Sequence, residues 1–240
     1  MASNETQQRI LDAAECLFAS EGFAATSLRT VIARAGVNIA AIHYHYGSKE
    51  ALIQAVFARR IGPLNEERLR RLDACEAAAG PLGPSVEEIL ESFIRPALRL
   101  KSSKTSGRPV LIELLSSAHN ESGGKITTLL YRQFEQVSAR FLRAFQTALP
   151  RLPVDELYVR FHFLIGTMAT SLSDPERLAF LSAGQVDPTD TESLASMLVA
   201  FLAAGLRAPA TVVDASNTRA AAKPSHKKAL RDVATPTESM

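Results

Sequence analysis

Apolar residues recur at helical spacing along nearly all of this 240-residue chain, and this periodicity constrains its fold more than any other feature. Residues three and four apart share one face of a helix, whereas every second residue shares one face of a strand. No run of alternating apolar and polar residues is long enough to predict a sheet. We therefore expect an all-α fold in which amphipathic helices bury their apolar faces against one another.

The N-terminal part of the chain predicts a head of three short helices. The first helix is expected over about residues 6–20. Thr26 or Ser27 can cap the second helix, and Gly36 can end it. Asn38 can then cap the third helix. Two short helices joined by a turn that contains glycine are typical of helix-turn-helix proteins, which place the second of them in the major groove of DNA.

The rest of the sequence predicts a helical bundle. A long helix is expected over about residues 49–72, with a kink near Pro63. Ser85 and Glu88 have the spacing of a capping box at the start of the next helix. Later breaks are expected at proline-containing pairs such as Asp174-Pro175. The further helices are expected over about residues 85–100, 109–118, 125–149, 155–172 and 191–206.

This pattern divides the chain into three parts. We expect a helix-turn-helix DNA-binding domain over residues 1–50 and a ligand-binding and dimerisation domain over residues 51–207. Residues 208–240 are rich in Ala, Thr, Ser, Pro and Lys and lack apolar periodicity, which predicts a disordered basic tail. Such a tail either adds non-specific affinity for DNA through counterion release or is an appendage without a function of its own.

Composition excludes several classes of protein. Apolar residues make up 46% of the chain and charged residues 22%, which is ordinary for a globular protein. Cys16 and Cys75 have no partner at disulfide or zinc spacing, so a reducing cytoplasm is expected. The apolar stretches are shorter than the about 18 residues of a membrane span. A net charge of +2 is weak support for DNA binding, which must therefore be argued from the local pattern.

The expected third helix has the two faces that a DNA-reading helix needs. Ile42 and Tyr46 are four residues apart and can pack inward together. The opposite face carries Ala40, Ala41, Tyr44 and His45. Alanines let a helix approach the bases closely and touch thymine methyl groups, while the tyrosine and histidine can donate hydrogen bonds to phosphates or base edges. Arg29 and Lys49 can add contacts to phosphates on either side.

The segment from Gln8 to Phe57 resembles the DNA-binding head of the TetR family of transcription regulators. The segment TSLRTVIARAGVNIAAIHYHYGSKE is similar to the family pattern T-x-x-x-I-A-x-x-A-G-V-x-x-x-x-[LIV]-Y-x-[HY]-F-x-[SN]-K. Two departures are that His43 stands where the family most often has a tyrosine that contacts phosphate, and that Tyr46 replaces the usual phenylalanine. The resemblance implies DNA-facing positions for Thr26, Arg29, Asn38, Ala40, Ala41, Tyr44, His45 and Lys49, to which we add Ser27 and His43.

The family resemblance also implies a function. It predicts a ligand-responsive repressor that binds a palindromic operator in double-stranded DNA as a homodimer, through the helices over residues 155–172 and 191–206. The sequence VNIAAIHYHYGSKEALIQAVF, followed by Ile-Gly-Pro-Leu-Asn, is similar to a subgroup that responds to fatty acids or acyl-CoA. Candidate ligand-binding residues are Phe93, Phe134 and Phe161 for an apolar body and Arg95, Arg132 and Arg160 for an acidic head group. Ordinary core packing and surface ion pairs are the alternatives for these six residues.

Other classes of function are less well supported by the sequence. His43 and His45 are two residues apart, so on a helix they point about 200° apart and cannot bind one metal ion. We expect no metal, no cofactor and no catalytic residues. The alternatives are an all-helical enzyme that acts on an acyl substrate and a DNA-binding protein that does not respond to a ligand.

Overall fold

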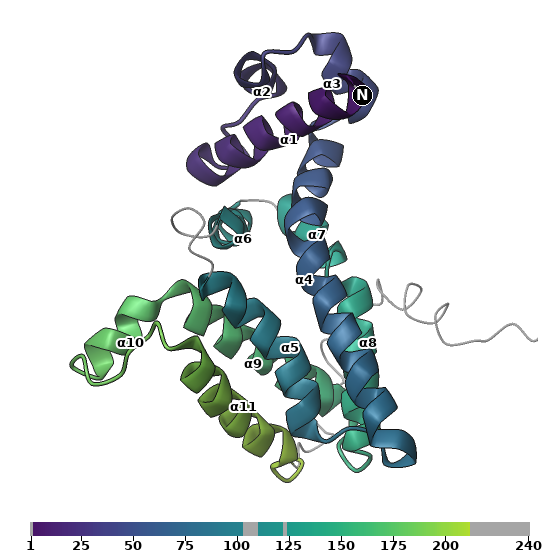
Figure 1. Ribbon diagram of the computed structural model, residues 1–240, viewed down its shortest axis with the longest axis vertical. Helices are drawn as coiled ribbons and strands as arrows, with labels where there is room; N and C mark the ends of the chain where they lie inside the picture. The colour runs from purple at the N-terminus through teal and green to yellow at the C-terminus, as the bar shows by residue number, and fades with distance from the viewer. Residues whose placement is uncertain (1, 103–109, 122–123, 212–240) are drawn as a thin grey trace, which may run out of the picture. The chain divides into compact units, whose positions relative to one another are not determined.

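The computed structural model describes residues 2–102, 110–121 and 124–211. Every regular element in these ranges is helical, which confirms the predicted all-α class (Figure 1). Within them, no helix combines the length and apolar character that a membrane span needs. The predicted basic tail lies outside the described residues from position 212 onward.

The three helices of the head begin and end close to where the sequence predicts. The side chain of Ser27 accepts a hydrogen bond from the Thr30 N–H at 3.1 Å and so caps the second helix. The side chain of Asn38 accepts one from the Ala41 N–H at 2.8 Å and caps the third. The helices are α1 (Ala2–Glu21), α2 (Leu28–Ala35) and α3 (Ile39–His45).

Helix α4 (Lys49–Ala79) joins the head to the bundle, as Figure 1 shows. It extends beyond the predicted end near residue 72, because residues 73–79 are DACEAAA, in which four alanines favour the helix. Pro63 lies inside the helix without ending it. The buried residues of α4 up to Ile61 belong to the core of the head, and Leu64 and Leu72 belong to the core of the bundle.

The bundle begins after a short 3-10 helix, η1 (Gly80–Leu82). Ser85 and Glu88 form the predicted capping box, because the Ser85 N–H donates to the Glu88 carboxylate at 2.7 Å and the Glu88 N–H donates to Ser85 Oγ at 3.3 Å. The helices that follow are α5 (Val86–Ser102), α6 (Val110–Asn120), α7 (Lys125–Arg132), α8 (Glu135–Ala148), α9 (Val154–Ser173), α10 (Pro175–Leu181) and α11 (Thr191–Arg207).

One prediction about the helices is wrong, and a second, the break at Asp174-Pro175, is confirmed but incomplete. The single helix expected over residues 125–149 is divided into α7 and α8 at Gln133 and Phe134, whose N–H groups donate to carbonyls three residues earlier at 3.0 Å. Asn65 of α4 donates to the carbonyl of Gln133 at 2.7 Å and satisfies it at this break. The Asp174-Pro175 pair starts α10 as well as ending α9, because the Asp174 side chain caps the Arg177 N–H at 3.1 Å.

The residues up to Pro209 form one compact unit that contains two hydrophobic cores. The core of the head is built from α1, α2, α3 and the first half of α4, and α6 and α7 also contribute to it through Leu114, Ala118, Leu129 and Leu130. The core of the bundle is built from the second half of α4 with α5, α8, α9 and α11. Phe134 is half-buried and packs against both cores. The domain boundaries proposed near residues 50 and 207 stay predictions.

Candidate nucleic-acid interface

The turn between α2 and α3 is held in place by α1. Gly36 ends α2 with a φ of +63°, in the left-handed region that glycine adopts without strain. The guanidinium of Arg9 on α1 donates to the carbonyl oxygens of Ala35 at 2.6 Å and Gly36 at 2.9 Å. These carbonyls have no partner inside α2, so Arg9 satisfies the end of the helix and fixes the turn at the same time. This role of Arg9 was not predictable from local spacing, because its acceptors lie 26 and 27 residues away in the chain.

Helix α3 packs inward through the residues that its spacing predicts. Ile42 is buried in the core of the head, and Val37 packs against that core from the turn. The Tyr46 hydroxyl donates to the carbonyl oxygen of Gln7 on α1 at 3.2 Å. Burial of this ring raises the pKa of the Tyr46 phenol above its ordinary value. The orientation of α3 about its own axis is therefore fixed by its inner face.

The outer face of α3 is open to solvent. Tyr44 is 82% exposed, and its ring meets the edge of the His45 ring with centroids 5.1 Å apart. Ala40 and His43 are exposed, and His43 Nδ1 lies 3.3 Å from the carbonyl oxygen of Gly47. Ala41 is half-buried against the core of the head. The Tyr44 hydroxyl, the His43 imidazole and the small side chain of Ala40 are thus accessible, and His45 is half-buried beside Tyr44.

Residues around α3 add further polar groups. Ser27 and Asn38 are exposed at the starts of α2 and α3, where their side chains cap the helices. Arg29 is exposed on α2, and its side chain makes no hydrogen bond or ion pair with any residue that the structure describes. The Lys49 ammonium donates to the carbonyl oxygen of Ala24 at 3.4 Å, which is a long contact that a phosphate could replace.

Thr26 does not lie on this surface. Its side chain is fully buried, and its hydroxyl donates to the carbonyl oxygen of Gly22 at 2.8 Å and lies 3.3 Å from that of Leu17. The hydroxyl therefore holds the loop between α1 and α2. The expectation that the Thr26 side chain faces DNA is wrong, because its donor is used inside the head.

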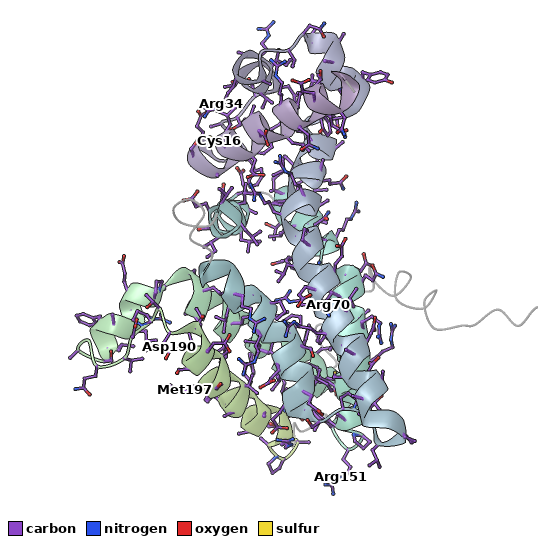
Figure 2. The ribbon with its side chains drawn as sticks, viewed as in Figure 1. Cys16, Arg34, Arg70, Arg151, Asp190 and Met197 are labelled. Atoms are coloured by element: carbon purple, nitrogen blue, oxygen red, sulfur yellow. The ribbon has the colours of Figure 1, made fainter. Side chains whose placement is uncertain are left out.

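The first half of α4 is tied to α1 by ion pairs. Arg59 pairs with Asp12 at 2.6 Å, and Arg60 pairs with the buried Glu15. The second oxygen of Glu15 and the Nη1 atom of Arg59 lie 3.9 Å apart without other hydrogen-bond partners. Arg34 of α2 also donates to Cys16 Sγ on α1 at 3.0 Å, and Figure 2 shows the two residues near each other. The head is thus a rigid unit attached to the start of α4.

The candidate ligand residues are distributed unevenly over the bundle. Phe93 and Phe161 are buried in its core with ring centroids 5.6 Å apart, whereas Arg132 is exposed on α7. Arg95 pairs with Glu192 and with Glu91. Two of the candidate residues thus pack together in the core, and Arg95 and Arg132 lie in ion pairs or at the surface. The set of six as a ligand site stays a prediction.

Arg160 also has partners within the protein. It donates to the carbonyl oxygens of Gly205, Leu206 and Ala208 at the end of α11, at 2.8–2.9 Å. It also pairs with Glu156 at 2.7 Å. Arg160 thus closes the C-terminus of α11 against α9.

A different arginine is the buried one. Arg68 of α4 is 2% exposed in the core of the bundle, where Nε donates to the carbonyl oxygen of Phe93 at 2.9 Å and Cζ lies 3.9 Å from the centroid of the Phe93 ring. Its Nη2 atom contacts Met168 Sδ at 3.6 Å. Arg68 was not among the predicted site residues, because it lies in the charged stretch NEERLRR. Its spacing from Leu64 and Leu72 nevertheless places it on the apolar face of α4.

The head presents a short helix with an accessible polar face, which a glycine turn holds in place. One long helix joins this head to a second core. This is the architecture of a helix-turn-helix transcription regulator. Comparison with known families narrows this class. Residues 10–56 match the family model described as bacterial regulatory proteins, tetR family. Residues 91–205 match the model described as tetracyclin repressor-like, C-terminal domain. The chain belongs to the TetR family of transcription regulators, as the sequence pattern predicts.

Similar regulators with known sequences match mainly in the head. The transcriptional regulator TtgR of Pseudomonas putida is 33% identical over 93 residues, which are 38% of this chain and 42% of TtgR. The regulator SrpR of the same species is 39% identical over 62 residues, which are 26% of this chain and 29% of SrpR. The chain thus matches less than half the length of these relatives.

Similar solved structures cover nearly the whole described chain. The fatty acid degradation regulator FadR of Bacillus halodurans superposes with a TM-score of 0.60 at 14% identity, covering 84% of this chain and 96% of that one. FadR of Bacillus subtilis, solved in complex with stearoyl-CoA, gives a TM-score of 0.60 at 14% identity, covering 83% and 98%. GusR of Salmonella enterica gives 0.55 at 23% identity, covering 84% and 94%. At these identities the similarity establishes the shared fold.

Proposed function

We propose that this protein is a ligand-responsive repressor that binds a palindromic operator as a homodimer and is released by a small hydrophobic or acyl effector. The observation that carries the proposal is the two-sided packing of α3. Its inner face is locked through Ile42 and Tyr46, and its outer face presents Tyr44 at 82% exposure. A helix with this arrangement can enter a major groove without rearranging the head.

The outer surface supplies both kinds of contact that operator recognition needs. Ala40 and Ala41 allow α3 to approach base edges, and Tyr44 and His45 can donate hydrogen bonds to bases or phosphates. Arg29 and Lys49, with the polar caps Ser27 and Asn38 and the imidazole of His43, can contact phosphates around the groove. Phosphate contacts would set the position of the head, and α3 would read the sequence.

Dimerisation is supported by exposed apolar side chains on α9 and α11. Several large apolar side chains on these helices are at least half exposed, although monomeric proteins seldom expose large apolar patches. Met197 of α11, labelled in Figure 2, is one of them. The set is Tyr158, Phe163, Met197 and Phe201. An isologous four-helix interface would bury them and hold two copies of α3 about 34–36 Å apart, as successive major grooves require.

Helix α4 is suited to transmit ligand binding from the bundle to the head. It contributes buried residues to both cores, and Arg59 and Arg60 tie its first half to α1. A ligand that shifts α4 would change the spacing of the two recognition helices. To switch the dimer from 1:99 to 99:1, the ligand must prefer the DNA-incompetent state by about 10⁴-fold. The stearoyl-CoA complex of the Bacillus subtilis FadR, which shares this fold, supports an acyl effector.

The test is selection of DNA sequences by the purified protein from random duplex DNA at near-physiological salt. We expect enrichment of an inverted repeat, and loss of that enrichment when Tyr44→Ala and Lys49→Ala are combined. Tyr131→Ala combined with Arg143→Ala provides the control, because it removes an aromatic ring and a cation from exposed positions on α7 and α8. Failure of the folded wild-type protein to enrich any sequence would contradict the proposal.

A further inference from the structure

Among the residues that the structure describes, Arg68 is the charged side chain buried in the core of the bundle, and its hydrogen-bond partners are neutral. The guanidinium has five N–H donors. Nε donates to the carbonyl oxygen of Phe93, and Nη2 contacts the thioether of Met168. Among the described residues, no carboxylate lies within 4 Å of it, so no ion pair compensates its charge. A thioether is a weak acceptor compared with a carboxylate or a phosphate.

The electrostatics of Arg68 differ from those of other arginines in the chain. Carboxylate partners raise the pKa of Arg60, Arg140 and Arg207. Burial alone lowers the pKa of Arg68 to about 9. At neutral pH the group is still charged, and a charge held in an apolar core without a counter-ion is strongly destabilising. An anion that entered this core would gain a nearly desolvated partner.

The surroundings of Arg68 indicate what kind of anion would fit. Phe93 lies over the guanidinium and packs against Phe141 and Phe161, with ring centroids 4.9 Å and 5.6 Å away. Met168 of α9 contacts Nη2 with a flexible, unbranched side chain that can move aside more easily than a branched one. These neighbours are apolar and polarizable. They suit the body of a hydrophobic molecule whose single acidic group reaches the arginine.

We propose that Arg68 binds the acidic head group of the effector, which is an organic acid with an apolar body inserted between α4, α5 and α9. This inference deepens the proposed function and rests on it. The head group displaces the Met168 thioether and forms charge-assisted hydrogen bonds with the guanidinium. Arg68 follows Ile61, a residue of the head core, by about two helical turns on α4, so a ligand at this point acts directly on the helix that carries the head.

The experiment uses two fluorescent probes with the same ring skeleton and different charge. The anionic probe is 8-anilinonaphthalene-1-sulfonate, and the neutral probe is N-phenyl-1-naphthylamine. Both are titrated into the full-length wild-type protein and into Arg68→Met, which keeps an unbranched side chain and removes the charge. We expect Arg68→Met to weaken binding of the sulfonate by at least about tenfold and to leave binding of the neutral amine within about twofold of wild type.

Two further variants make the comparison specific. Arg70→Met removes a charge from an exposed position on the same helix, labelled in Figure 2, and should change neither affinity. Arg68→Lys keeps a charge without the guanidinium fork and should retain part of the preference for the sulfonate. A cooperative urea transition of each variant shows that the probes report on folded protein. Equal sulfonate affinity in Arg68→Met and wild type, or an equal loss of both probes, would overturn the assignment.

Operator binding separates this inference from the proposed function. The operator duplex is titrated with wild type and Arg68→Met in the absence of probe, and both should bind it. If wild type binds no operator, the proposed repressor function fails, whatever the probes show. If wild type binds the operator and its sulfonate affinity does not depend on Arg68, only the head-group assignment fails.

Discussion

Burial of the Arg68 charge should lower the free energy of unfolding of the ligand-free protein by a measurable amount. The guanidinium keeps a carbonyl oxygen and an aromatic ring as partners, and both recover only part of the hydration that it loses on burial. Its folded pKa of about 9 lies below the ordinary arginine value, so the folded state disfavours the charged form. Below pH 9 both the folded and the unfolded chain hold the proton, and the cost is present in full. Stability would rise with pH only above that value, where the folded chain loses the proton first.

We therefore expect Arg68→Met to raise the free energy of unfolding by about 1–4 kcal/mol, since an apolar side chain of similar length removes the buried charge. The gain should be the same at pH 6 and pH 8, because Arg68 stays protonated across this range. Urea unfolding followed by circular dichroism at the two pH values measures it. A decrease in stability would mean that the contacts with Phe93 already outweigh the cost of burying the charge.

Whether the position of an individual residue could be predicted from the sequence depends on what buries its side chain. The inward positions of α3 were predictable, because Ile42 and Tyr46 follow helical spacing. The burial of Thr26 was not, because it depends on how the loop after α1 folds back toward Leu17. Arg68 could have been singled out by its place between Leu64 and Leu72 on the apolar face of α4. Its missing counter-ion, however, is a property of α5, α8 and α9, which are distant in sequence.

At the scale of elements, the turn between α2 and α3 determines how the recognition helix is presented. Gly36 has a φ of +63°, and a Cβ at this position would lie 2.8 Å from a guanidinium nitrogen of Arg9. Another residue would therefore have to adopt a left-handed conformation and also displace the arginine that fixes the turn. Gly62 in α4 is different, because a Cβ there would meet nothing within 4 Å.

Gly36→Ala should accordingly lower the free energy of unfolding by about 1–2 kcal/mol and weaken operator binding. The matched control Gly62→Ala should raise the free energy of unfolding by about 0.5–1 kcal/mol, since alanine favours a helix interior over glycine. Urea unfolding and operator titration of the two variants provide the measurements. The role assigned to the turn is wrong if Gly36→Ala retains the stability and operator affinity of wild type.

Most helices could be predicted because their caps and periodicity are local. Ser27, Asn38 and Ser85 each accept the predicted hydrogen bond from a residue three positions later. The break between α7 and α8 could not, because that stretch has no glycine or proline and its free carbonyl is satisfied by Asn65, 68 residues earlier in the chain. The start of α10 could have been found, since an aspartate followed by proline is a signal for a helix start as well as a stop.

At the scale of the whole molecule, two groups of exposed apolar side chains in the bundle have different consequences. Phe163 of α9 and Phe201 of α11 are 60% and 68% exposed on the helices proposed to form the dimer. Phe180 and Leu181 of α10 are 85% and 73% exposed on the segment between those helices. Exposure alone does not separate an interface from an accessible surface. Only the first group lies on the two long helices that can form a four-helix contact around a two-fold axis.

Phe163→Glu combined with Phe201→Glu should therefore convert the proposed dimer into a monomer, because four carboxylates would be buried at the proposed isologous interface without partners. The control is Phe180→Glu combined with Leu181→Glu, which adds the same charge to α10 and should leave the dimer intact. Sedimentation velocity gives the oligomeric state, and operator titration gives the consequence. The monomer should bind an inverted repeat about 10²-fold more weakly or worse, since its two half-sites are no longer held by linked heads. If the control variant dissociates and the α9–α11 variant remains dimeric, the interface lies on α10 and the proposed spacing of the recognition helices has to be derived again from that contact.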